Sequence, residues 1–124
     1  MKLLKHLLLI NWHYFSHEYL DMDQINFLTG KTGAGKTTII DAIQLLLLGD
    51  TVGHYFNKSA SDKSNRSLKG YLRCEIGSDD DGSPLYLRNG HFSSYVAMEF
   101  FDDVTNNSFV IGVVFDVFDD GNYD

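Results

Sequence analysis

The residues with the clearest chemical potential form a glycine-rich loop in the first third of the chain. The loop reads Gly30-Lys31-Thr32-Gly33-Ala34-Gly35-Lys36-Thr37 and fits the pattern G-x-x-x-x-G-K-[ST] at every fixed position. In such a loop, consecutive backbone N–H groups surround phosphate oxygens, and side chains at the glycine positions would crowd the anion. The spacing therefore predicts a site for the phosphates of a nucleoside triphosphate.

The residues that follow the last glycine have expected roles of their own. Lys36 is expected to reach the β- and γ-phosphates, and the Thr37 hydroxyl is expected to ligate Mg²⁺. Thr38 is placed to bond the α-phosphate. A helix that begins near Lys36 would direct its positive end at the same phosphates. The alternative is a glycine-rich turn that only caps a helix.

Other sequence features narrow the class of nucleotide-binding protein. Asn57-Lys58-Ser59-Ala60 begins like a guanine-reading N-K-x-D element, but Ala60 replaces the carboxylate and the segment follows the loop too closely. Val113-Val114-Phe115-Asp116 imitates a Walker B strand, but no catalytic carboxylate follows it, so an ordinary strand is the preferred interpretation. We therefore expect ATP and Mg²⁺ as ligands, and we assign no catalytic residue to this chain.

Two strands and a helix are predicted to position the loop. Apolar runs indicate strands over His6–Trp12 and Asp23–Leu28, with a turn between them at residues 16–21. Apolar residues recur at helical spacing over Lys36–Leu48. Asp41 and Gln44 alone interrupt that apolar surface, so the helix is expected to be buried nearly all round. Gly49 is a natural end for it.

The pattern changes after this helix. Residues 49–66 are a polar loop, and Arg66–Leu72 is expected to form a short helical turn. Strands are then predicted at four places, joined by short polar turns that favour antiparallel hairpins: Leu72–Ile76, Leu85–Arg88, Tyr95–Phe101 and Phe109–Phe118. The expected fold is α/β, with a mixed sheet and antiparallel hairpins around one buried helix. It forms one domain over 1–124, with the strands and loop helix in 1–72 and an antiparallel β part in 73–124.

Composition and charge limit the possible environment and partners. The chain has 124 residues, of which 44% are hydrophobic, and one cysteine, so disorder and a disulfide-stapled scaffold are both excluded. Its apolar runs are too short to cross a membrane. Residues 1–73 hold nine Lys/Arg against six Asp/Glu, a balance of +3, whereas residues 74–124 hold one against eleven, a balance of −10. Any contact with nucleic acid should therefore lie in the first part or in chain outside these residues. The single cysteine and the short apolar runs make a cytoplasmic location the expectation.

Three segments around the loop resemble a known family. Ile10-Asn11-Trp12-His13-Tyr14-Phe15, then Ile25-Asn26-Phe27-Leu28-Thr29-Gly30, and then Ile39-Ile40-Asp41-Ala42-Ile43-Gln44 look like the start of an SMC-like, ABC-type ATPase. Phe56-Asn57-Lys58 and the stretch from Ser67 to Arg73 are similar to the MukB-like, condensin-type subunit of the Wadjet plasmid-defence systems.

The resemblance implies that the chain is the N-terminal half of an ATPase head. The partners would be the C-terminal half of the same head, a second head that sandwiches ATP, DNA, and accessory condensin-type subunits, with no membrane. ATP hydrolysis is expected only of the full-length protein, since no Q-loop glutamine is evident. In such heads an arginine after the loop helix approaches nucleotide or DNA. Arg66 is the nearest match, with Lys69 and Arg73 beside it, and a solvated basic stretch is the alternative.

Two other functions fit the same residues. The chain could be an autonomous ATP-binding interaction module without hydrolysis, or a stand-alone P-loop kinase, which needs a lid and further parallel strands that this pattern does not supply.

Among the remaining residues, Trp12 to Phe15 could contact adenine, although core packing is favoured. A metal site at His13 and His17 and a calcium site at the aspartate pairs are both disfavoured by their spacing. Cys74 is expected in the core.

Overall fold

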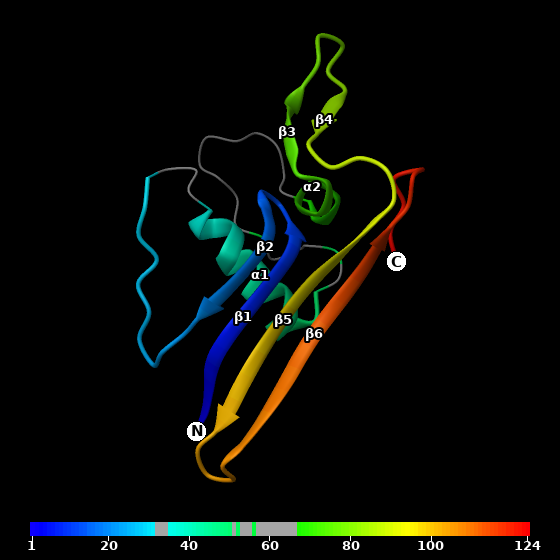
Figure 1. Ribbon diagram of the computed structural model, residues 1–124. Coiled ribbons are helices and arrows are strands. Elements are labelled where there is room, and N and C mark those ends of the chain that lie inside the picture. The colour runs from blue at the N-terminus through cyan, green and yellow to red at the C-terminus, as the bar shows by residue number, and fades with distance from the viewer. Residues whose placement is uncertain (32–34, 51, 53–55, 57–66) are drawn as a thin grey trace.

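The main structural element is a four-stranded antiparallel sheet. The computed structural model describes residues 1–31, 35–50, 52, 56 and 67–124. The sheet contains β1 (Lys2–Trp12), β2 (Phe15–Asp21), β5 (Phe92–Asp102) and β6 (Asn107–Val117), in the order β2-β1-β5-β6 (Figure 1). The first strand therefore lies in the middle and pairs with both β2 and β5. Strands from the two ends of the chain share one sheet.

Two helices and a small hairpin complete the described structure. Helix α1 (Lys36–Leu48) contacts β5 and β6, and the short helix α2 (Leu68–Arg73) contacts β1. Strands β3 (Glu75–Ser78) and β4 (Pro84–Tyr86) form a separate two-stranded antiparallel sheet. In Figure 1 this hairpin extends from α2 away from the large sheet.

The core lies between one face of the large sheet and the two helices. Alternation along β1 places Leu7 and Leu9 on that face, where both are fully buried. The alternation breaks at Asn11, whose backbone has a left-handed φ of 52° and whose side-chain amide donates to the Ser93 carbonyl at 2.8 Å. As a result Trp12, one residue later than the period predicts, is also buried in the core.

The connection between the first two strands differs from the prediction. The chain reverses at His13 and Tyr14, and residues 16–21, predicted as a turn, belong to β2. Most residues of β2 are exposed, and their polar character fits its place at the edge of the sheet. The strand predicted over Asp23–Leu28 is wrong. There the Asn26 side-chain amide accepts a hydrogen bond from the Asp23 N–H at 2.8 Å and donates one to the Asp23 carbonyl at 2.7 Å, which competes with strand pairing.

The loop helix has the predicted bounds but not the predicted burial. Helix α1 begins at Lys36 and ends at Leu48, and Gly49 follows with a left-handed φ of 61°. The Gly49 N–H donates to the Leu45 and Leu46 carbonyls, and the Asp50 N–H donates to the Leu45 carbonyl, which closes the helix. However, Ile40, Leu47 and Leu48 are exposed. The expectation of burial all round is therefore wrong for the chain as described, because only one side of α1 faces the sheet.

The second part of the chain follows the predicted pattern with shifted bounds. The helical turn expected at Arg66–Leu72 is α2, and the four predicted strands appear as β3, β4, β5 and β6. The hairpins are antiparallel as expected, and all strand pairs in the described residues are antiparallel, so the mixed sheet is not seen there. Most of the predicted polar loop at 49–66 lies outside the described residues.

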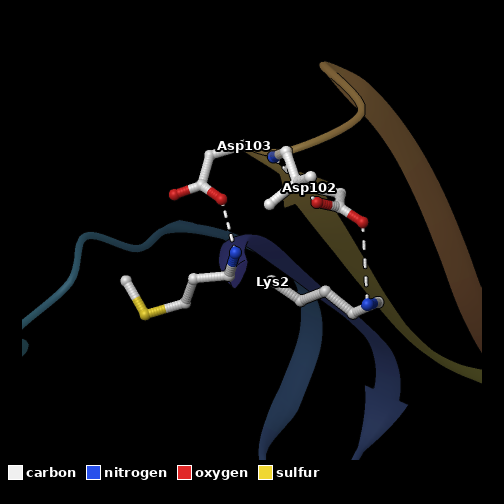
Figure 2. Close-up of polar contacts among 5 residues, drawn as sticks. Lys2, Asp102 and Asp103 are labelled. Atoms are coloured by element: carbon white, nitrogen blue, oxygen red, sulfur yellow. Dashed lines mark hydrogen bonds and ion pairs between the residues drawn. The ribbon is translucent and has the colours of Figure 1, made fainter.

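The start of β1 is held to the turn between β5 and β6 by charged groups. The Lys2 ammonium lies 3.6 Å from an Asp102 carboxylate oxygen, and the amino group of Met1 donates to Asp103 (Figure 2). Asp102 also accepts a hydrogen bond from the Val104 N–H at 3.0 Å. This backbone hydrogen bond, aided by the nearby Lys2 charge, holds the pKa of Asp102 below its ordinary value. Among the described residues no helix is long and apolar enough to span a membrane.

The lowered pKa of Asp102 predicts an acid-dependent stability. A depressed folded-state pKa means that the ionised carboxylate stabilises the fold above its unfolded pKa of about 3.9, and that this stabilisation is lost as pH falls through the folded value. Thermal melts from about pH 5 to about pH 2 should therefore show a smaller acid-induced loss for Asp102→Asn than for the wild type. Asp80→Asn, in the exposed turn between β3 and β4, is the matched control. Equal acid losses for Asp102→Asn and the wild type would contradict the prediction.

Candidate nucleotide site

The end of the predicted phosphate loop is placed at the open start of α1. Gly35 precedes the helix with a left-handed φ of 101°, a conformation that favours glycine. Within the described residues, no side chain caps this helix end, and the first turn holds no acidic residue. The positive end of the helix is thus available to an anion. Thr32, Gly33 and Ala34 lie outside the described residues.

Lys36 lies over the beginning of the loop. Its ammonium group donates to the Gly30 carbonyl and, at 3.3 Å, to the Lys31 carbonyl. The two ends of the motif are therefore brought together by the lysine that is expected to bind phosphate. A cation held by neutral carbonyls can exchange them for phosphate oxygens, which form stronger charge-assisted hydrogen bonds.

The two threonines after Lys36 differ in accessibility. Thr37 is half-buried in the first helical turn, next to the lysine. Thr38 is only 6% exposed, and its carbonyl accepts a hydrogen bond from the Trp12 indole at 3.1 Å. Thr38 is therefore part of the contact between α1 and the sheet, and little of its surface is open to an α-phosphate.

Tyr71 of α2 fixes the other side of the loop helix. Its hydroxyl donates to Asp41, a carboxylate of α1 that is completely buried. Its ring stacks on Trp12 with centroids 4.9 Å apart, and its carbonyl accepts the His13 N–H at 2.8 Å. One side chain thus joins α1, α2 and the end of β1.

This role of Tyr71 was missed at the level of sequence. The available signal was Asp41, because a carboxylate inside an otherwise apolar helix must be hydrogen-bonded if it is buried. The sequence alone does not indicate which of the hydrogen-bond donors supplies that contact. The ring of Phe56 also lies edge-on to Tyr71, with centroids 4.7 Å apart.

The basic residues near α2 divide into different roles. Arg66 lies outside the described residues. Arg73 is only 4% exposed, and its guanidinium donates to the Phe118 carbonyl at 2.5 Å and to the Arg88 carbonyl at 3.3 Å. It therefore joins chain segments inside the protein and does not face a ligand. Lys69 lies over the Tyr86 ring, 5.8 Å from its centroid.

Arg88 makes a second set of internal contacts. It donates to the Leu72 carbonyl at 2.6 Å and to the His13 carbonyl at 3.1 Å, and burial lowers the pKa of its guanidinium. Arg73 and Arg88 both lie over the Phe92 ring, 5.6 and 5.4 Å from its centroid. The two arginines thereby connect the end of β1, α2 and β5.

The other residues considered in the sequence lie in the core, in strands or at the surface. Trp12 is fully buried, so its ring packs in the core, whereas Tyr14 is 56% exposed. The Walker B-like segment lies in β6, where Asp116 accepts from the Ser93 hydroxyl at 2.6 Å. Cys74 is buried as expected. Within the part of the chain that the structure describes, no group of three or more His, Cys, Asp or Glu side chains could hold a metal ion.

Comparison with known families supports the assignment of the loop. Residues 4–63 match the family described as the P-loop containing region of AAA domain. The match spans β1, β2, the glycine-rich loop and α1. It supports a P-loop NTPase-like domain and therefore nucleotide binding, which typically involves Mg²⁺. A comparison with curated proteins found no match.

The contact between Tyr71 and Asp41 leads to a stability prediction. Tyr71→Phe keeps the stacked ring but removes the hydroxyl that donates to a buried carboxylate, so the free energy of unfolding should fall by about 1–3 kcal/mol. Urea denaturation measures the change. Tyr14→Phe, which removes a hydroxyl from an exposed ring of the same neighbourhood, should change it by less than about 0.5 kcal/mol. A Tyr71→Phe protein as stable as the wild type would show that the hydroxyl contributes nothing to holding α1.

Proposed function

We propose that this chain binds Mg²⁺–ATP as the N-terminal half of an SMC-like, ABC-type ATPase head that acts on DNA. The observation that carries the nucleotide site is the position of Lys36, which lies over Gly30 and Lys31 at the uncapped start of α1. The residues proposed to bind the nucleotide are Gly30, Lys31, Thr32, Gly33, Ala34, Gly35, Lys36, Thr37 and Thr38, with Arg66 as a further candidate.

The described residues fit a metal-bound triphosphate. An ammonium group and the positive end of a helix converge on the loop, and no carboxylate in the first turn of α1 opposes an anion. In this proposal Lys36 leaves the loop carbonyls for the β- and γ-phosphates, and the Thr37 hydroxyl provides a ligand for Mg²⁺. The metal, when bound, neutralises part of the phosphate charge.

The exposed apolar residues support the proposed partner, the C-terminal half of the same head. Ile25 is 76% and Phe27 is 85% exposed, in a segment that pairs with no strand among the described residues. Ile40, Leu47 and Leu48 are exposed on α1. Exposed large apolar side chains of this kind favour a surface that a partner covers. We propose that residues 24–29 and the open side of α1 are covered by that half, so that residues 1–124 complete a head only with it.

The wider assembly is part of the same proposal. A second head would close over the bound ATP, accessory condensin-type subunits would join, and hydrolysis would belong to the complete protein in the cytoplasm, in a system such as plasmid defence. The charge distribution favours a DNA contact in residues 1–73, which carry a balance of +3, because phosphate contacts require cations.

The gene itself distinguishes this proposal from an autonomous ATP-binding module. Downstream of Asp124, the head proposal expects a long coiled-coil sequence with heptads, followed by a signature motif and a Walker B motif. A stop codon directly after Asp124 would contradict it and leave the autonomous module.

Substitution of the loop lysine tests the nucleotide site. Lys36→Ala removes a charge-assisted contact to phosphate, so the affinity for fluorescently labelled ATP with Mg²⁺ should fall by about tenfold to a hundredfold. Lys5→Ala, which removes an equal charge from strand β1, outside the loop, should change the affinity far less. Thermal melts of both variants establish that they fold. Normal ATP binding by a folded Lys36→Ala protein would exclude the proposed site.

A further inference from the structure

We infer that Phe15 is a positioning residue for the phosphate loop: its ring packs against Gly35 and holds the end of the loop in the conformation that binds phosphate. This inference rests on the proposed nucleotide site. It concerns a residue outside the G-x-x-x-x-G-K-[ST] motif, in a different secondary-structure element.

The end of the β1–β2 hairpin presents two aromatic side chains to the start of α1. Trp12 and Phe15 are direct partners in the register of the two strands, so their side chains lie on the same face of the hairpin. The Trp12 indole donates to the Thr38 carbonyl in the first turn of the helix. Phe15 is half-buried and packs against the same core. The hairpin therefore contacts both the first turn of α1 and the residue just before it.

The contact between Phe15 and Gly35 is so close that a side chain at position 35 would require the Phe15 ring to move. A β-carbon added to Gly35 would lie 2.8 Å from Cζ and 3.3 Å from Cε2 of the Phe15 ring, well inside van der Waals contact. Gly35 also has a φ of 101°, which residues with a side chain rarely adopt. The ring thus occupies the space that the absent side chain leaves, and it faces the loop with its para carbon.

Such a contact affects ligand binding through the loop. A glycine-rich loop has many accessible backbone conformations, and binding phosphate with consecutive N–H groups requires one of them. A rigid ring packed on the last glycine removes alternatives before the ligand arrives, which lowers the entropy lost on binding. The neighbouring Tyr14 does not provide this contact, because its ring lies edge-on to His13, with centroids 4.3 Å apart.

The first experiment compares two phenylalanines of similar burial in the full-length protein. Phe15→Ala should weaken Mg²⁺–ATP binding by about tenfold, because the loop residues must then be ordered by the ligand. Phe100→Ala removes another half-buried ring that packs against the same core and stacks on Phe109, near the other end of the sheet. Both variants should melt at lower temperature than the wild type, but Phe100→Ala should keep wild-type ATP affinity.

The second experiment uses a substitution that should leave ATP affinity unchanged if Phe15 only packs in the core. Phe15→Tyr keeps the ring but adds a hydroxyl at Cζ, the atom nearest to Gly35. It should weaken ATP binding severalfold while changing the melting temperature by little, and Phe15→Leu should lie between the wild type and Phe15→Ala in affinity.

Wild-type ATP affinity in folded Phe15→Tyr and Phe15→Leu proteins would overturn the inference. Tighter binding by Phe15→Ala would also overturn it, since the ring would then obstruct the site. Loss of ATP binding in Lys36→Ala with unchanged affinity in all Phe15 variants would refute this inference and leave the nucleotide site intact.

Discussion

The hydrogen bond from the Trp12 indole to the Thr38 carbonyl is the contact on which the arrangement of the candidate site depends. It joins the end of the central strand to the first turn of the helix that carries Lys36. Trp12 reaches this position because Asn11 takes a left-handed conformation and shifts the side-chain alternation by one residue. Tyr71 then stacks on the buried indole and holds Asp41 of the same helix. The position of the loop relative to the sheet is thus determined by a polar contact inside an aromatic cluster, and the apolar core supports it.

Short-range signals allowed the motif and its helix to be predicted from sequence. The fixed glycines, Lys36 and the apolar period predicted the bounds of α1, because these depend on neighbouring residues along the chain. The strand at residues 15–21 was missed because its residues are polar, and their pairing with β1 is a tertiary contact. The segment at 23–28 was misassigned for the opposite reason: its apolar residues favour a strand, but Asp23 and Asn26 bond each other and no described strand pairs with it. Neither outcome is encoded in local periodicity.

The basic residues show how tertiary structure changes the interpretation of charge. Arg73 contributes to the positive balance of residues 1–73, which made this region a candidate for nucleic-acid contact, whereas Arg88 is the single cation of the acidic part. The structure directs both guanidinium groups at backbone carbonyls and the Phe92 ring, so their charges serve internal packing. Arginine suits this role because its five donors can satisfy several carbonyls at once. Among the described residues, the positive charge near the loop comes from Lys36, Lys31 and the helix end.

The central place of β1 in the sheet has a consequence for the order in which the protein is made. Its partner β5 lies some 90 residues later in the chain, so the pairing of Leu7 with Met98 must wait for the C-terminal strands to be synthesised. Contacts of such long sequence separation form late and slow folding. While the chain grows on the ribosome, the β1–β2 hairpin and the loop helix emerge before the strand that completes their sheet. Nucleotide added to a nascent chain that ends before residue 92 would therefore encounter the motif without the framework that supports it.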